Sequence, residues 1–185
     1  MDLEQEKELV ERARGDSEAF GEIYEQYYSQ IFGYILRRTA SIEIAQDITS
    51  EVFFKALKNL GQFHWRDIPF SSWLYRIATH EIANYFRKNN HRYSSLEEVS
   101  NLMSDSNPTV ESELIEAEAE LKRHEAFLAL HENISRLPAK YQEVITLRFF
   151  ENKQLKEIVE ILGKRQGTVK SLLHRGLAKL RELMD

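Results

Sequence analysis

Hydrophobic residues recur every three to four positions along most of this chain, the spacing that gives a helix one apolar face. In the first half this pattern predicts four helices, at about residues 3–13, 17–38, 42–60 and 71–88. Short polar residues able to cap free backbone N–H groups begin three of these stretches: Asp16 or Ser17, Ser41, and Ser71 or Ser72. Residues 62–69 have no period and end in a proline, which predicts a loop.

The second half of the chain begins with a change of composition. From Tyr93 to Glu111 the helical pattern gives way to Ser, Asn, Asp and Glu, which indicates a linker. An acidic amphipathic stretch at 112–136 follows, and three more helices are predicted at about 139–150, 153–162 and 167–184. We therefore expect an all-α protein of two helical domains, residues 1–92 and 112–185, joined by a flexible acidic linker at 93–111.

Charge is distributed unevenly over the 185 residues, whose net charge is −5. Residues 137–185 carry 10 basic and 6 acidic side chains, whereas residues 93–136 carry 3 and 10. A basic segment of this kind is typical of a nucleic-acid-binding surface. The absence of cysteine excludes disulfides and thiolate metal sites. With no signal-like start and no apolar run near the ~20 residues of a membrane span, we expect a cytoplasmic protein without membrane insertion.

Two helices near the C-terminus, separated by Gly163 and a brief turn, predict a helix-turn-helix, whose second helix enters the DNA major groove. The outward face of that helix carries cations for phosphates and guanine edges, and hydroxyls that allow close approach. The candidate DNA-binding residues are Arg165, Gln166, Thr168, Lys170, Ser171, His174, Arg175 and Lys179. An ordinary amphipathic helix with a solvated basic face is the alternative.

The last 49 residues closely resemble the domain of the sigma-70 family that binds the promoter −35 element. The matching pieces are Leu137-Pro138, VITLR at 144–148, Glu157-Ile158, GTVKS at 167–171 and HRG at 174–176. The compact form without extra domains is similar to the extracytoplasmic-function group, sigma factors that direct RNA polymerase to selected promoters. The resemblance implies that Lys170, Ser171, His174 and Arg175 contact the −35 element or its phosphates.

The predicted helix at 42–60 carries Asp47 and Glu51 one turn apart on one face. Like charges at this spacing repel slightly, and a basic partner would offset the repulsion and speed docking. The stretch AQDITSEVFFKAL at 45–57 resembles the core-polymerase helix of the family. The resemblance implies binding to the β′ coiled coil of core RNA polymerase through Asp47, Glu51, Phe54 and Lys55, with the β flap as a further contact. A solvated acidic face is the alternative.

The stretch FSSWLYRIA at 70–78 matches the promoter-melting helix of the family, and basic and aromatic residues continue to Arg92. Cations beside aromatic walls suit opened DNA, because they follow the backbone while bases stack. In relatives the preceding loop, here about residues 61–69, forms a pocket for a base of the −10 element. The candidate −10 residues are His64, Trp65, Arg66, Arg76, His80, Asn84, Arg87 and Lys88, with Phe63 as a further pocket wall, whereas Trp73, Leu74 and Ile77 are expected in the core.

Sequence motifs for catalysis are incomplete or missing. His80-Glu81 starts a zinc-protease motif, but Asn84 stands where the second histidine belongs. We expect no catalytic residue, no cofactor and no metal. The expected function is that of an alternative sigma factor, with core polymerase, promoter DNA and an anti-sigma factor as partners. A stand-alone helix-turn-helix regulator and a helical interaction protein with an incidental basic tail are the alternatives.

Overall fold

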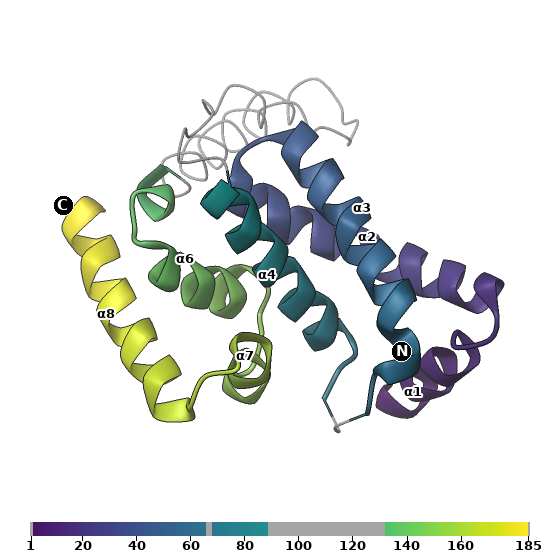
Figure 1. Ribbon diagram of the computed structural model, residues 1–185. Helices are drawn as coiled ribbons and strands as arrows, with labels where there is room; N and C mark the ends of the chain where they lie inside the picture. Colours follow the sequence, from purple (N-terminus) through teal and green to yellow (C-terminus); the bar gives the residue numbers. More distant parts are fainter. Residues whose placement is uncertain (1, 66–67, 89–131, 185) are drawn as a thin grey trace, which may run out of the picture.

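The structure, a computed structural model, describes residues 2–65, 68–88 and 132–184 (Figure 1). Within these ranges the chain is built from helices joined by short turns, with no strand, so the predicted all-α class is confirmed. The candidate Arg66, the predicted linker at 93–111 and most of the predicted acidic helix at 112–136 lie outside the described residues. Among the described helices, none is long and apolar enough to cross a membrane.

Residues 2–88, which we call the N-terminal unit, pack their helices around one apolar core. Its elements are α1 (Leu3–Arg12), α2 (Ser17–Thr39), α3 (Ile42–Asn59), the 3-10 turn η1 (Leu60–Gln62) and α4 (Ser71–Lys88). Asp2, Asp16 and Ser41 accept backbone N–H bonds at the starts of α1, α2 and α3, so two of the predicted caps are confirmed. The chain turns from α2 into α3 at Ala40, which adopts a left-handed conformation.

Residues 132–184, the C-terminal unit, contain the predicted helix-turn-helix. The elements are α6 (Ala139–Ile145), the π-helical turn η3 (Thr146–Phe150), α7 (Leu155–Leu162) and α8 (Gln166–Met184). A single helix was predicted over 139–150, but its last turn is wider because the Glu151 N–H bonds to the Thr146 carbonyl at 3.1 Å. Gly163 ends α7 with a φ of 61°, a conformation that favours glycine.

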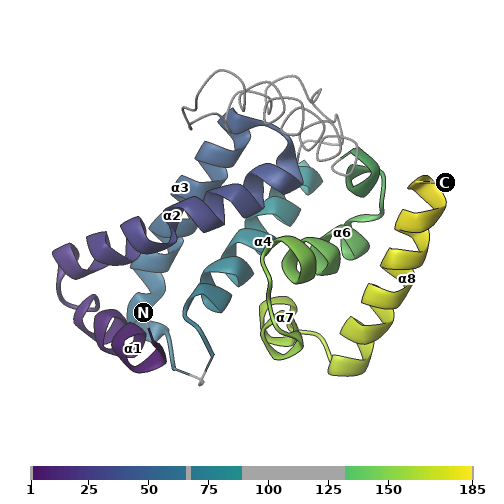
Figure 2. The ribbon, with the colours of Figure 1, turned by 180° about the vertical axis from the view of Figure 1, so that it is seen from behind.

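The two units contact each other directly, a relationship that the sequence pattern did not indicate. Helix α7 packs against α4, and η3 packs against α2. Figures 1 and 2, which view the chain from opposite sides, both show α6 and α7 beside α4, with α8 on the outer side. The predicted division into two domains is therefore compatible with a closed arrangement in which they touch.

Candidate DNA and protein interfaces

The predicted DNA-reading face of α8 is open to solvent over its whole length. All eight candidates are exposed, namely Arg165, Gln166, Thr168, Lys170, Ser171, His174, Arg175 and Lys179. The opposite face is held by Val169, Gly176 and Leu180, which are buried. A Cβ on Gly176 would lie 3.1 Å from Ile145 Cδ1, so this glycine lets α8 approach α6 closely. Leu183, near the end of the helix, is 39% exposed.

Helix α4 carries a second row of polar side chains on one face. Arg76, His80, Asn84 and Arg87 are three or four residues apart, so they line up along the helix. Arg76, His80 and Arg87 are exposed, and Asn84 accepts a hydrogen bond from Arg87 Nη2 at 2.9 Å. Lys88 is exposed at the C-terminal end. The row has cations at its two ends, Arg76 at one and Arg87 with Lys88 at the other, which suits a nucleic-acid backbone.

A pocket of about 170 Å³ opens at the Arg76 end of that row. Its walls include Phe63, His64, Trp73 and Arg76, from the loop and from α4. Phe63 lies at the centre of an aromatic cluster, with ring centroids 5.0 Å from Trp73 and 6.3 Å from Trp65. Leu74 is fully buried as expected, but Trp73 is only half-buried and lines the pocket as well as packing on the core.

Helix α7 of the C-terminal unit supplies one wall of this pocket. Glu160 lines it, and a carboxylate oxygen of Glu160 lies 3.8 Å from Arg76 Nη1. The arginine that was predicted to bind the −10 element therefore faces an acidic side chain of the other unit. The Arg76 side chain itself remains 44% exposed beside Glu160.

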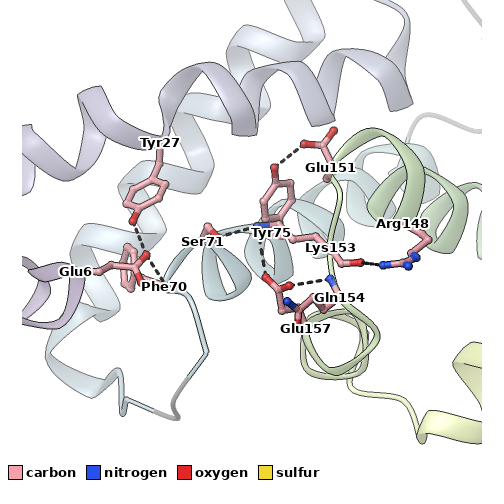
Figure 3. A network of polar contacts seen from close by, with 10 residues as sticks. All are labelled: Glu6, Tyr27, Phe70, Ser71, Tyr75, Arg148, Glu151, Lys153, Gln154 and Glu157. Carbon is pink, nitrogen blue, oxygen red and sulfur yellow. Dashed lines mark hydrogen bonds and ion pairs between the residues drawn. The ribbon is translucent and has the colours of Figure 1, made fainter. Parts of the chain in front are cut away.

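A network of polar contacts joins the two units (Figure 3). Glu151 accepts hydrogen bonds from Tyr75 Oη at 2.6 Å and from Arg37 Nε at 3.1 Å. Lys153 Nζ donates to Ser71 Oγ at 2.9 Å and lies 4.6 Å from the centre of the Tyr75 ring. These residues were not predicted, because neither their spacing nor their charge marks them out in the sequence.

Burial changes the protonation equilibria of this network. Burial and then the neighbouring Glu151 raise the pKa of Tyr75 well above its ordinary value, so the phenol stays protonated and donates. Burial lowers the pKa of Lys153, while the carboxylates of Glu157 and Glu151 oppose that change. Glu157 is itself held in place, because its carboxylate accepts the Gln154 N–H at 2.7 Å at the start of α7.

The loop beside the pocket is attached to the N-terminal helix. Arg14 Nη2 donates to the Phe63 carbonyl at 2.7 Å, and the Glu6 carboxylate accepts the Phe70 N–H at 3.0 Å. Glu6 also accepts a short hydrogen bond from the Tyr27 hydroxyl (Figure 3). Neither Glu6 nor Arg14 was predicted as a site residue. The available signal was that Glu6 shares an apolar face of α1 with Leu9, where a charged residue is unexpected.

The candidate protein-binding face of α3 combines acidic and apolar side chains. Asp47 and Glu51 are exposed, and Phe54 is 60% exposed on the same side of the helix. Leu57, one turn beyond Phe53, is 50% exposed. Lys55 is engaged within the protein, because it pairs with Glu51 at 3.0 Å and with Glu81 of α4 at 2.7 Å.

Exposed apolar side chains beside acids suit a protein partner better than a nucleic acid. The carboxylate of Glu81, and after it that of Glu51, raises the pKa of Lys55.

Among the described residues, no group of three or more metal-ligating side chains comes together.

Comparison with known proteins matches both units to one family. Residues 23–92 match the model of sigma-70 region 2, and residues 127–180 match that of sigma-70 region 4. The chain is 32% identical to the ECF RNA polymerase sigma factor SigW of Bacillus subtilis, over 98% of this chain and 97% of that protein. It is also 34% identical to the ECF RNA polymerase sigma factor BldN of Streptomyces coelicolor, over 96% of this chain but only 65% of that protein.

Solved structures share the fold. CnrH, in complex with the cytosolic domain of CnrY, superposes with a TM-score of 0.70 at 22% identity, over 97% of both chains. The sigma factor RpoE of Bartonella quintana, in complex with the anti-sigma factor NepR, has a TM-score of 0.67 at 16% identity, over 89% of this chain and 96% of that one.

Proposed function

The chain belongs to the sigma-70 family of RNA polymerase sigma factors, in its extracytoplasmic-function group, and we propose how its surfaces divide the work of promoter-specific initiation. It binds core RNA polymerase and directs it to promoters, while the polymerase supplies the catalysis in the cytoplasm. The proposed domains are residues 1–92 for core binding and the −10 element, 93–111 as a linker, and 112–185 for the −35 element. The observation that carries this division is that separate exposed surfaces of different chemistry lie on the two units.

The polymerase-docking surface is the exposed face of α3. Asp47 and Glu51 supply charge that orients a basic partner, and Phe54 supplies apolar area that is buried on docking. The β′ coiled coil is the proposed partner. Lys55 acts mainly within the protein by holding Glu51 and Glu81, so its contribution to docking is indirect. By family resemblance the partners extend to the β flap and to an anti-sigma factor, which would keep polymerase from this face.

The −10 surface is the α4 row together with the loop pocket. Arg76, His80, Asn84, Arg87 and Lys88 follow the opened strand, and the pocket beside Phe63 and Trp73 receives a base. His64 and Trp65 lie in the loop beside the pocket. Arg66 of the same loop is proposed as a further −10 contact from the sequence. Extruding a base costs a few kcal/mol, which stacking and hydrogen bonds in a pocket offset.

The −35 surface is the exposed face of α8. Its arginines and lysines provide phosphate and base contacts, and Thr168 and Ser171 allow close approach of the helix to the groove. Leu172 is partly buried, but Leu177 is 42% exposed, so it presents an apolar side chain to the DNA side.

Simultaneous use of both DNA surfaces requires the two units to separate. The −35 and −10 elements are about 25 base pairs apart by their names, which is about 85 Å at about 3.4 Å per pair. Helix α8, with 19 residues, is only about 28 Å long, and it is joined through α7 to α4. The closed arrangement is therefore a state of the free protein, and the promoter-bound state is open.

Reconstitution with bacterial core polymerase tests the proposal. The purified chain should bind core polymerase, and genome-wide run-off transcription should show start sites that core polymerase alone does not use. The start sites should share two upstream sequence blocks with a constant spacing. Absence of core binding together with absence of specific start sites would refute the function.

A further inference from the structure

The N-terminal helix α1 and the turn after it hold both ends of the pocket loop. Arg14 reaches the carbonyl of Phe63, where the chain enters the loop, and Glu6 reaches the N–H of Phe70, where the chain leaves it for α4. Figures 1 and 2 both place α1 at the end of the molecule where this loop lies. Two side chains eight residues apart thus fix two loop positions seven residues apart.

The Glu6 carboxylate is buried and makes defined hydrogen bonds. Glu6 is 5% exposed, and its carboxylate lies at the start of α4, where free N–H groups and the helix dipole favour negative charge. The Tyr27 hydroxyl donates a hydrogen bond to the same carboxylate, and the ring centroids of Tyr27 and Phe70 are 6.0 Å apart. An apolar residue would fill this position without the cost of burying a carboxylate. What the carboxylate adds is a directed bond to one loop end.

Helix α1 is anchored well enough to act as a rigid support. Leu9, Val10 and Ala13 are buried in the core, so apolar packing holds α1 in place. The match to sigma-70 region 2 begins at residue 23, so α1 lies before the part of the chain that the family model describes.

We propose that Glu6 and Arg14 are positioning residues for −10 recognition, which set the spacing between Phe63 and Phe70 and thereby the width of the base pocket. The proposal rests on the proposed function of that pocket. Neither residue touches DNA. Loss of either bond lets the loop end move, so the pocket holds bases of different size and edge pattern with less discrimination. Core docking, which uses the outer face of α3, stays unchanged.

Tryptophan fluorescence tests the support in the free protein. The chain has two tryptophans, Trp65 and Trp73, and both pack against Phe63. Arg14→Ala should shift the emission to longer wavelength and increase quenching by acrylamide, while the far-ultraviolet circular dichroism stays the same. Arg14→Lys, which restores a donor, should reverse much of the change. Arg12→Ala is the matched control, because it breaks an ion pair of α1 without touching the loop.

Base selectivity in the holoenzyme tests the function. The strongest promoter from run-off transcription is randomised at its −10 positions, and the transcribed templates are sequenced. Arg14→Ala and Glu6→Leu, each of which removes one bond to the loop, should each reduce selectivity at a −10 position by about three- to tenfold, the effect of one hydrogen bond. Selectivity at −35 and core affinity should match those of Arg12→Ala. If Arg14→Ala does not fold, Glu6→Leu makes the same comparison, and Arg14→Lys, which keeps a donor, should stay close to the original protein.

Two results would overturn the inference. One is an unchanged −10 preference in folded variants whose tryptophans have become more accessible. The other is an equal loss of selectivity at −10 and −35, which indicates a general loss of structure. Failure of the proposed function looks different, because the unmodified protein itself would then show no core binding and no specific start sites.

Discussion

Tyr75 in the first unit donates a hydrogen bond of 2.6 Å to Glu151 in the second. The same carboxylate accepts a bond from Arg37, and the Glu151 side chain is 4% exposed. Replacing Glu151 with alanine removes the acceptor that Tyr75 and Arg37 share at this contact, where the Glu151 side chain is almost fully buried. We expect Glu151→Ala to weaken closure by about 2 kcal/mol, which is about 30-fold in the closed-to-open ratio.

Because the chain has no cysteine, closure can be measured with introduced labels. Dyes on Gln26→Cys of α2 and Glu182→Cys of α8, both exposed positions, should show a longer mean distance in the Glu151→Ala protein. Glu132→Ala is the control, because it removes an acid whose ion pair with Arg136 lies within the C-terminal unit. Equal distances in the two variants would show that Glu151 does not hold the units together.

The sequence predicted the elements well and their arrangement poorly, for a physical reason. Periodicity and caps depend on neighbours within a few residues, so the start of α2 after Asp16 and the end of α7 at Gly163 could be predicted locally. The π-helical turn at Thr146 could not, because it differs from an α-helix by a single hydrogen-bond step. The contact between Tyr75 and Glu151 joins positions 76 residues apart, which no local pattern reports.

The candidate sites divide in the same way. The exposed rows on α4 and α8 were predictable, because helical spacing alone assigns a residue to a face. Glu160 beside Arg76 was not, since it comes from another part of the chain. Glu6 and Arg14 bond to a loop that follows two intervening helices, and the only local signal was a charged residue, Glu6, on the apolar face of α1.

Alkaline pH should destabilise the folded chain. Burial raises the pKa values of Tyr27, Tyr34 and Tyr75, so above the ordinary pKa of 10.0 the unfolded chain releases protons that the folded protein keeps. The contribution of these tyrosines to the free energy of unfolding is fully present below pH 10.0 and falls as the pH rises further. The lowered pKa of Lys153 acts in the opposite direction, because up to 10.5 the unfolded chain holds a proton that the folded protein has released.

Denaturant unfolding from about pH 9 to about pH 11 measures the balance. The unfolding free energy should fall over the upper part of this range. Tyr75→Phe should lower the stability at neutral pH, because Glu151 loses a donor, but should make the alkaline decline shallower. A slope that is the same in the original protein and in Tyr75→Phe would contradict the assignment to Tyr75.

Gly176 should be intolerant of larger side chains. Its Cβ position lies 3.1 Å from Ile145 Cδ1 and 3.2 Å from Tyr141 Cβ, so the two further methyls of valine would push α8 away from α6. We expect Gly176→Val to reduce the unfolding free energy by about 1–3 kcal/mol. Gly167→Ala, also in α8 but with nothing within 4 Å of its Cβ, should unfold at the same denaturant concentration as the original protein or slightly above it.

Charge reversal on α3 should abolish polymerase docking. Asp47→Lys with Glu51→Lys places two cations where a basic partner is expected, and both positions are exposed, so the fold should be retained. Core binding, measured by fluorescence anisotropy, should fall by at least about 100-fold. Glu25→Lys, at an exposed position of α2, should bind normally. Normal binding by the double variant with a native circular dichroism spectrum would exclude this face as the docking surface.

Phosphate and base contacts on α8 can be separated by their dependence on salt. If Arg175 contacts a guanine edge, Arg175→Ala should reduce selectivity at one −35 position by about 1–3 kcal/mol. If it contacts a phosphate, the variant should weaken binding to all promoters alike and reduce the slope of log affinity against log salt by about 1.

Arg181→Ala is the matched control, because Arg181 is an exposed arginine in the last turn of α8, beyond the candidate face. Because Arg175 is exposed and pairs with no acid among the described residues, either loss reflects DNA binding and leaves the unfolding midpoint and core affinity unchanged. Equal effects of the two substitutions would place the −35 contact elsewhere on the C-terminal unit.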